Sequence, residues 1–172
     1  DAKPVLYTAW HTLAYTGLRR GELLGLEWSD VDFENKTISI NRTLVSINGR
    51  LSVQSPKTKR STRTISLDDS TVQILKDWKL EQKKLFFKHG IKSRNIVITN
   101  TVGGYFDFAN FRDDLQTFIS KHKLKQFSVH SLRHTHASLL FEAGIEPKTI
   151  SDRLGHSNIQ TTLDMYTQLN DR

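Results

Sequence analysis

The stretch from His130 to Tyr166 reads HSLRHTHASLLFEAGIEPKTISDRLGHSNIQTTLDMY. Its apolar residues recur at close to helical spacing, and Gly144 and Gly155 stand where glycine commonly follows the end of a helix. Pro147, which suits the first turn of a helix, follows the first of these glycines. The pattern predicts three successive helices, the last of which carries Tyr166 near its end.

Four side chains of this stretch suggest chemistry on a phosphate. His130 and Arg133 are three residues apart, so they share one face of a helix. His156 follows a glycine on a predicted tight turn, where its ring can project. We interpret Tyr166 as a nucleophile and the other three as groups that prepare a phosphate for its attack. The simpler alternative is that Tyr166 is a core residue whose hydroxyl finds one partner, which is the commoner role of a tyrosine on an apolar face.

The other histidines of the stretch have plainer interpretations. His136 lies at helical spacing from two leucines, which is typical of a structural histidine. His134 lies four residues after His130, so the two could share a zinc ion. However, Arg133 between them would repel a cation, and the segment lacks the glutamate of the zinc-peptidase motif. We therefore expect no metal site here.

Length and composition favour one globular domain. The chain has 172 residues, enough for a single domain with a proper core. It has no cysteine, which excludes disulfides, a thiolate nucleophile and a Cys-ligated metal. No apolar run is long enough to span a bilayer and no signal peptide is visible, so we expect a cytoplasmic protein without a membrane partner.

The positive charge is concentrated in patches. The net charge is +7 and the sequence pI is about 9.7, which indicates a polyanionic partner. Residues 1–55 carry six basic and six acidic side chains, whereas residues 56–67 carry four basic and no acidic ones. Residues 121–125 add three lysines. Such patches are expected of a surface that follows a DNA backbone, although a solubilising surface is the simpler alternative. The candidate DNA-binding residues are Lys57, Lys59, Arg60 and Arg63.

The periodicity of the whole chain predicts a mainly α fold with one small three-stranded antiparallel β-sheet, an α+β class. Asn48-Gly49 is a strong signal for a hairpin turn between the first two strands. Helices are expected at residues 3–15, 20–27, 68–88, 107–122, 128–143 and 147–154, and strands at residues 37–47, 51–54 and 63–67.

Three further residues are candidates for the same site. Arg19 and Glu22 stand at the break after the first helix, and Glu22 could hold Arg19 or another nearby base in place. Lys57 lies in the basic loop between the second and third strands, which is polar enough to reach into a groove. An exposed side chain beside Arg20 remains the alternative for Arg19.

These motifs resemble those of the tyrosine recombinase (phage integrase) family. Residues 16–23, TGLRRGEL, resemble its first arginine motif, residues 130–135, HSLRHT, resemble its His-x-x-Arg motif, and residues 154–157, LGHS, resemble its second histidine motif. The details are similar to integrases of phages or integrative elements of Gram-positive bacteria. The family's catalytic residues fall on Arg19, Lys57, His130, Arg133, His156 and Tyr166.

The resemblance implies a tyrosine recombinase catalytic domain over residues 1–172, without the family's N-terminal DNA-binding domain. It implies site-specific cleavage and rejoining of double-stranded DNA through a covalent 3′-phosphotyrosine, with no cofactor and no metal. It also implies a homotetramer on DNA for the full-length protein, acting with excisionase or DNA-bending accessory proteins.

Three other functions remain open from the residues. A type IB topoisomerase shares the logic of this site and would relax DNA without a specific target. A DNA-binding module without catalysis would need only the basic patches. A metal-dependent nuclease would lose its activity in a chelator.

Overall fold

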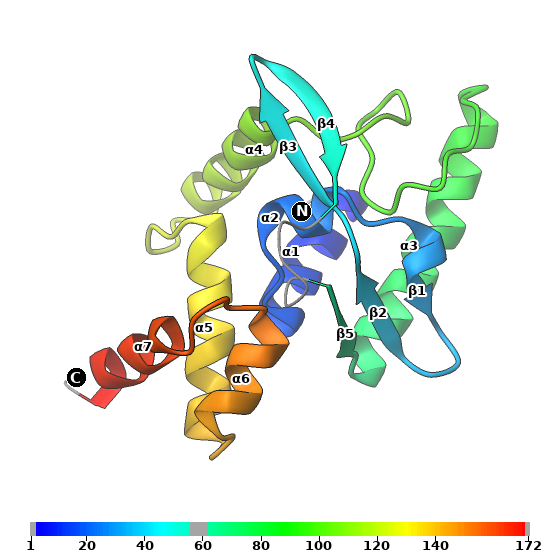
Figure 1. Cartoon of the computed structure of the whole chain (residues 1–172). Helices are drawn as coiled ribbons and strands as arrows, with labels where there is room; N and C mark the ends of the chain where they lie inside the picture. The colour runs from blue at the N-terminus through cyan, green and yellow to red at the C-terminus, as the bar shows by residue number, and fades with distance from the viewer. Residues whose placement is uncertain (1–2, 56–61, 171–172) are drawn as a thin grey trace.

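The structure is a computed structural model that describes residues 3–55 and 62–170. Three of the four predicted DNA-binding residues, Lys57, Lys59 and Arg60, therefore lie outside the described residues. The described part is mostly helical, with two small antiparallel sheets (Figure 1). Its helices are α1 (Pro4–Thr16), α2 (Arg20–Leu24), α3 (Asp69–Lys88), α4 (Phe108–Lys121), α5 (Val129–Glu142), α6 (Pro147–Leu154) and α7 (Gln160–Asn170), with a short 3-10 helix at Trp28–Asp30.

Helix α1 lies at the centre and joins the two halves of the fold. It packs against α3, which lies beside the three-stranded sheet, and against α5, which carries the His-x-x-Arg motif (Figure 1). Helices α6 and α7 pack on each other and on α5. A small apolar cluster fixes α5 and α6 together and contains Ala137, Phe141, Ile150 and Leu154.

The pairing of the strands differs from the prediction. The three-stranded sheet has the order β1–β2–β5 and consists of β1 (Val31–Asp32), β2 (Thr37–Ile40) and β5 (Arg63–Ser66). A separate hairpin pairs β3 (Thr43–Ile47) with β4 (Arg50–Gln54). The prediction of one strand over residues 37–47 was therefore wrong, and the third predicted strand pairs with β2 instead of β4.

The two residues that separate β2 from β3 make polar contacts that account for this break. Asn41 Nδ2 donates to Asp30 Oδ1 (3.0 Å), and Arg42 forms ion pairs with Asp30 (3.3 Å) and Glu27. These contacts hold the chain against the 3-10 helix and turn the β3–β4 hairpin away from the sheet (Figure 1). The predicted Asn48-Gly49 turn is confirmed: both residues have positive φ, 50° and 77°, as a type I′ turn requires.

Helix boundaries follow the predicted signals closely. Asp68 accepts a hydrogen bond from the Thr71 backbone N–H (2.9 Å) at the start of α3, and Ser128 accepts one from the Ser131 N–H (3.2 Å) at the start of α5. Helix α2 is shorter than predicted and ends at Leu24. Within the described residues, none of the helices is both long and apolar enough to cross a membrane.

Gly17 makes a turn that no other residue type fits. It ends α1 with a φ of +67°, and an added Cβ would lie 2.7 Å from side-chain atoms of both His136 and Leu154. An L residue would therefore be strained in its backbone and would also clash with α5 and α6.

We predict that Gly17→Ala lowers the free energy of unfolding by about 2–5 kcal/mol, the sum of left-handed strain and overpacking. Gly144→Ala is the matched control, because Gly144 also follows a helix with a φ of +76° but has nothing within 4 Å of the added Cβ. That control should cost only about 1–2 kcal/mol. Urea unfolding measures both changes, and equal losses would contradict the predicted clash.

Candidate active site

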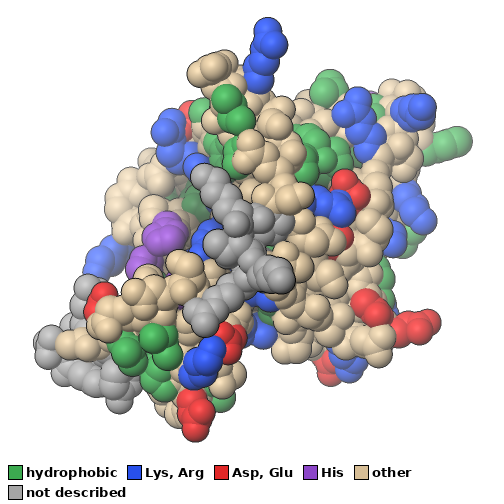
Figure 2. All heavy atoms as spheres, in the orientation of Figure 1, with side chains coloured by type: hydrophobic (Ala, Val, Ile, Leu, Met, Phe, Trp, Pro, Cys, Tyr) green, Lys and Arg blue, Asp and Glu red, His purple; other side chains and the backbone are tan. Residues whose placement is uncertain are grey.

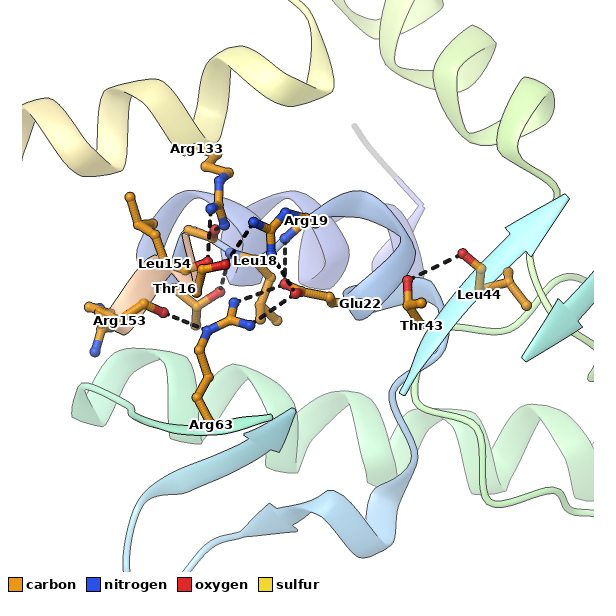
Figure 3. A network of polar contacts seen from close by, with 12 residues as sticks. Thr16, Leu18, Arg19, Glu22, Thr43, Leu44, Arg63, Arg133, Arg153 and Leu154 are labelled. Carbon is orange, nitrogen blue, oxygen red and sulfur yellow. Dashed lines mark hydrogen bonds and ion pairs between the residues drawn. The ribbon is translucent and has the colours of Figure 1, made fainter. Parts of the chain in front are cut away.

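The carboxyl end of α6 gathers three arginines from distant parts of the chain (Figure 3). Arg63 Nε donates to the Arg153 carbonyl (2.7 Å), Arg133 Nη2 to the Leu154 carbonyl (2.8 Å) and Arg19 Nη2 to the Gly155 carbonyl (2.9 Å). The last carbonyls of a helix lack partners within the helix and carry its partial negative charge. The end of α6 therefore favours cationic donors.

Glu22 lies among these guanidinium groups and binds two of them. Its Oε1 accepts from Arg19 Nη1 (3.0 Å) and Arg63 Nη1 (2.9 Å), and its Oε2 accepts from Arg63 Nη2 (2.9 Å). Burial raises the pKa of Glu22. The hydrogen bonds and charges of Arg63 and Arg19 lower it by more, so the net pKa lies below its ordinary value. The carboxylate is therefore ionised at neutral pH. The expected contact between Glu22 and Arg19 is present, and the supporting role of Glu22 in the site stays a prediction.

Arg133 is almost completely buried, with 2% of its surface exposed. Its Nη1 donates to the Gly17 carbonyl (2.6 Å) at the end of α1, while its Nη2 binds α6. Burial, followed by the charge of Arg19, lowers its pKa to about 9, so it stays protonated at pH 7. A guanidinium has five N–H donors, and these two bonds use two of them.

Arg19 is the accessible member of the cluster. Its side chain is 41% exposed, whereas that of Arg63 is 7% exposed. The backbone N–H of Arg19 also donates to Glu22 Oε2 (2.9 Å), which fixes the start of α2. Among the described residues, Arg19, Arg63 and Arg133 carry three positive charges around the one negative charge of Glu22. This excess suits the binding of an anion.

His156 is buried, and the prediction of a projecting ring was wrong. The Gly155 turn, with a φ of +68°, folds the chain back so that the His156 N–H donates to the Ser151 carbonyl (3.0 Å). Its Nδ1 lies 2.7 Å from the Thr162 hydroxyl, at the start of α7. Burial and the charges of Arg133 and Arg19 lower its pKa to about 4, so the ring is neutral.

Thr162 is the hydrogen-bond partner of His156 Nδ1, a contact that no sequence pattern indicated. If the hydroxyl donates to Nδ1, the ring proton lies on Nε2. In that tautomer Nε2 is a hydrogen-bond donor at neutral pH without a positive charge. The contact spans a non-helical turn, so neither helical nor strand spacing could have paired the two residues.

His130 stands exposed in the first turn of α5. Its ring meets that of His134 edge to face, with the centroids 4.7 Å apart. Partial burial lowers its pKa, and the charges of His134, Arg133 and Arg19 lower it further. On the face shown in Figure 2, histidine side chains gather over α5 with Lys and Arg side chains beside them. Because Arg19 and Arg133 act on the pKa of both His130 and His156, these four predicted residues share one electrostatic environment.

Arg63 requires a correction. It was predicted to bind DNA with the basic loop, but its side chain is buried against Glu22 and the Arg153 carbonyl. The two-residue period of a β-strand could have indicated this burial, because Arg63 lies two residues before the buried Ile65 and so shares its face. The loop's charge concealed that signal.

The interpretation of His136 as a structural residue is confirmed. Arg153 Nε donates to His136 Nε2 (3.1 Å), so the ring proton lies on Nδ1, which donates to the Ala14 carbonyl (3.0 Å). Burial and then the charge of Arg153 lower the pKa of His136 to about 4. The neutral ring joins α1, α5 and α6 behind the site.

Two predicted residues cannot be placed in this geometry. Lys57 lies outside the described residues. Tyr166 belongs to α7, which packs on α5 and α6, but its side chain lies outside the described part of the structure. Across the described residues, no group of three or more His, Cys, Asp or Glu side chains is placed to hold a metal ion.

Comparison with known proteins identifies the family. Residues 3–172 match the phage integrase family. The chain is 36% identical to a XerC-like tyrosine recombinase of Caldanaerobacter subterraneus subsp. tengcongensis, over 90% of this chain and 43% of that protein. It is 32% identical to the ICEBs1 integrase of Bacillus subtilis, over 96% of this chain and 45% of that protein. The chain thus spans less than half the length of these relatives.

A solved structure shows the same fold. The Tn1549 transposon integrase, determined in complex with circular intermediate DNA, superimposes with a TM-score of 0.82 at 28% identity. The match covers 92% of this chain and 54% of that one. The motifs, the fold and these relatives agree, and the chain belongs to the phage integrase family of tyrosine recombinases.

Proposed function

We propose that this chain is the catalytic domain of a site-specific DNA recombinase that integrates or excises a mobile element. It would cleave and rejoin DNA strands through a covalent 3′-phosphotyrosine at Tyr166. The observation that carries this proposal is the cluster of Arg19, Arg133 and His156 at the end of α6, immediately before the helix that contains the tyrosine.

The arginine cluster fits the charge of the reaction. A phosphodiester is anionic, and its transition state gathers more charge on the two nonbridging oxygens. Arg19 and Arg133 supply planar guanidinium donors for these oxygens, and His156 Nε2 supplies a further hydrogen bond. One well-placed donor of this kind contributes about 100- to 1,000-fold in rate. The charge is supplied by side chains, so the proposed reaction requires no cofactor.

Tyr166 requires help to become a nucleophile. A free tyrosine has a pKa of about 10, so only about one in a thousand is ionised at pH 7, and full ionisation costs roughly 4 kcal/mol. His130 is the proposed base, because its lowered pKa keeps the ring neutral and able to accept the phenolic proton. Electrons of the phenolate oxygen then form the bond to phosphorus.

Lys57 is the proposed general acid. It would protonate the 5′-oxygen as the bond between phosphorus and that oxygen breaks, which leaves a free 5′-hydroxyl. General acid help of this kind contributes typically about 100- to 10,000-fold. Rejoining reverses the step when the 5′-hydroxyl of a second strand attacks the phosphotyrosine, so no external energy source is needed.

The proposed partner is double-stranded DNA bearing attachment sites. The net charge of +7 supports it, and Lys57, Lys59 and Arg60 remain the proposed contacts of the basic loop. A homotetramer of the full-length protein, with excisionase or DNA-bending accessory proteins, would complete the recombination complex. We place this activity in the cytoplasm of a bacterial host, where such DNA lies.

We predict that Tyr166→Phe abolishes the covalent protein–DNA adduct and leaves DNA affinity unchanged, because only the nucleophilic oxygen is removed. The assay uses a suicide substrate with a nicked attachment site of the parent element, analysed by denaturing gel, and mass spectrometry identifies the modified tyrosine. Tyr7→Phe is the control, since Tyr7 is exposed on α1. An adduct of undiminished yield in Tyr166→Phe would refute the proposed nucleophile.

We predict that cleavage loses rate in acid with a midpoint below pH 6.5, because His130 must be neutral and its pKa is lowered. The second-order rate constant at low protein concentration reports this ionisation in the free protein. His134→Gln is the matched variant: it removes a neighbouring charge that lowers the pKa of His130, so the midpoint should move towards pH 6.5. An unchanged acid limb in His130→Gln would contradict the assignment.

A further inference from the structure

Arg63 is held inside the site by hydrogen bonds from all three of its guanidinium nitrogens, which a DNA-contacting role would not need. It is the first residue of β5, and its side chain is 7% exposed. Nη1 and Nη2 each donate to one oxygen of Glu22 at 2.9 Å, and Nε donates to the Arg153 carbonyl at 2.7 Å (Figure 3). All three nitrogen atoms of the guanidinium therefore bind inside the protein.

This fork is the main neutralising contact of Glu22. A buried carboxylate is stable as an anion only when it is paired and hydrogen-bonded. Burial raises the pKa of Glu22, and the contacts with Arg63 oppose this more strongly than those with Arg19. Arg63 thus keeps Glu22 charged and fixes the plane of its carboxylate.

The orientation of Glu22 in turn sets that of Arg19. Arg19 Nη1 donates to the same Oε1 that Arg63 Nη1 binds, and Arg19 Nη2 donates to the Gly155 carbonyl. Arg63 also packs against the Gly155 turn, where an added Cβ would lie 2.7 Å from its Nη1. One buried side chain therefore contacts both groups that hold the half-exposed Arg19.

We propose that Arg63 is a positioning residue for strand cleavage, which acts through Glu22 to hold Arg19 against the scissile phosphate. This inference rests on the proposed function. It assigns to Arg63 no contact with DNA. The fork geometry is the essential feature, because a lysine would keep the charge but could not bind both carboxylate oxygens and the Arg153 carbonyl in one plane.

The test compares R63K with R94K, a matched change at an arginine in an exposed loop. Single-turnover cleavage of the nicked substrate is measured at saturating protein, together with DNA affinity and thermal stability. R63K should lower the rate constant by about 10- to 100-fold, as expected for a misplaced catalytic group. Its DNA affinity and its final yield of adduct should equal those of the wild type, and R94K should be unchanged in all three.

These readouts separate positioning from two other roles. A purely structural role would lower the yield of adduct and the thermal stability while the active fraction kept its rate constant. A DNA contact would lower the affinity and its dependence on salt. Either of these outcomes, or cleavage by R63K at the wild-type rate, overturns the proposal.

A crystal structure of R63K supplies a readout independent of cleavage. The contact between Arg19 Nη1 and Glu22 Oε1 should be lost while the backbones of α2 and β5 stay in place. Its retention would refute the proposal. If the wild type forms no adduct, the proposed function fails and this structure still decides the role of Arg63.

A paired change covers the case in which R63K does not fold. The variant R63M/E22Q removes both members of the buried Arg63–Glu22 ion pair, so neither is left without its partner, and it should disturb folding less than the loss of Arg63 alone. Its rate constant for cleavage should be no higher than that expected for R63K, because Arg19 has lost the carboxylate that holds it. Cleavage by R63M/E22Q at the wild-type rate would overturn the proposal.

Discussion

The site depends on the ion pairs that the ionised carboxylate of Glu22 forms. This carboxylate lies between a buried arginine from β5 and a half-exposed arginine immediately before α2, and both arginines also bind carbonyls at the end of α6. Segments that lie far apart in the sequence therefore meet at one buried anion. Without it, like-charged guanidinium groups would repel each other in a region of low dielectric, where such repulsion is strong.

Within residues 3–55 and 62–170 the cluster holds more positive than negative charge, and this imbalance is linked to the proposed function. Helix-end carbonyls offer only partial charges, and one carboxylate cannot neutralise Arg19, Arg63 and Arg133 together. Burial, followed by the charge of Arg19, lowers the pKa of Arg133, so keeping this guanidinium charged costs free energy in the free protein. A bound DNA phosphate would supply the missing charge. Sites of this kind keep a local destabilisation that a fully neutralised cluster would remove, and they gain affinity for an anion in exchange.

The motifs predicted much of the fold and of the site, and the failures have specific physical causes. Local signals were sufficient for the helix ends at Ser128 and Gly155, because caps and glycines act within a few residues. The break between β2 and β3 depends on Asp30, which lies earlier in the chain, and strand periodicity does not register such a contact. Burial of Arg63 likewise depends on Glu22, which lies 41 residues earlier in the sequence.

The two site histidines show how surroundings separate residues of one type into different roles. Both have a lowered pKa, and the same arginines contribute to each shift. His130 is exposed on α5, so in the proposed reaction its neutral ring can take up a proton and release it to solvent. His156 is buried with Nδ1 against Thr162, and burial and the arginine charges keep its ring neutral. In the proposed reaction, burial and one hydroxyl thus distinguish a proton acceptor from a hydrogen-bond donor, which sequence spacing alone could not do.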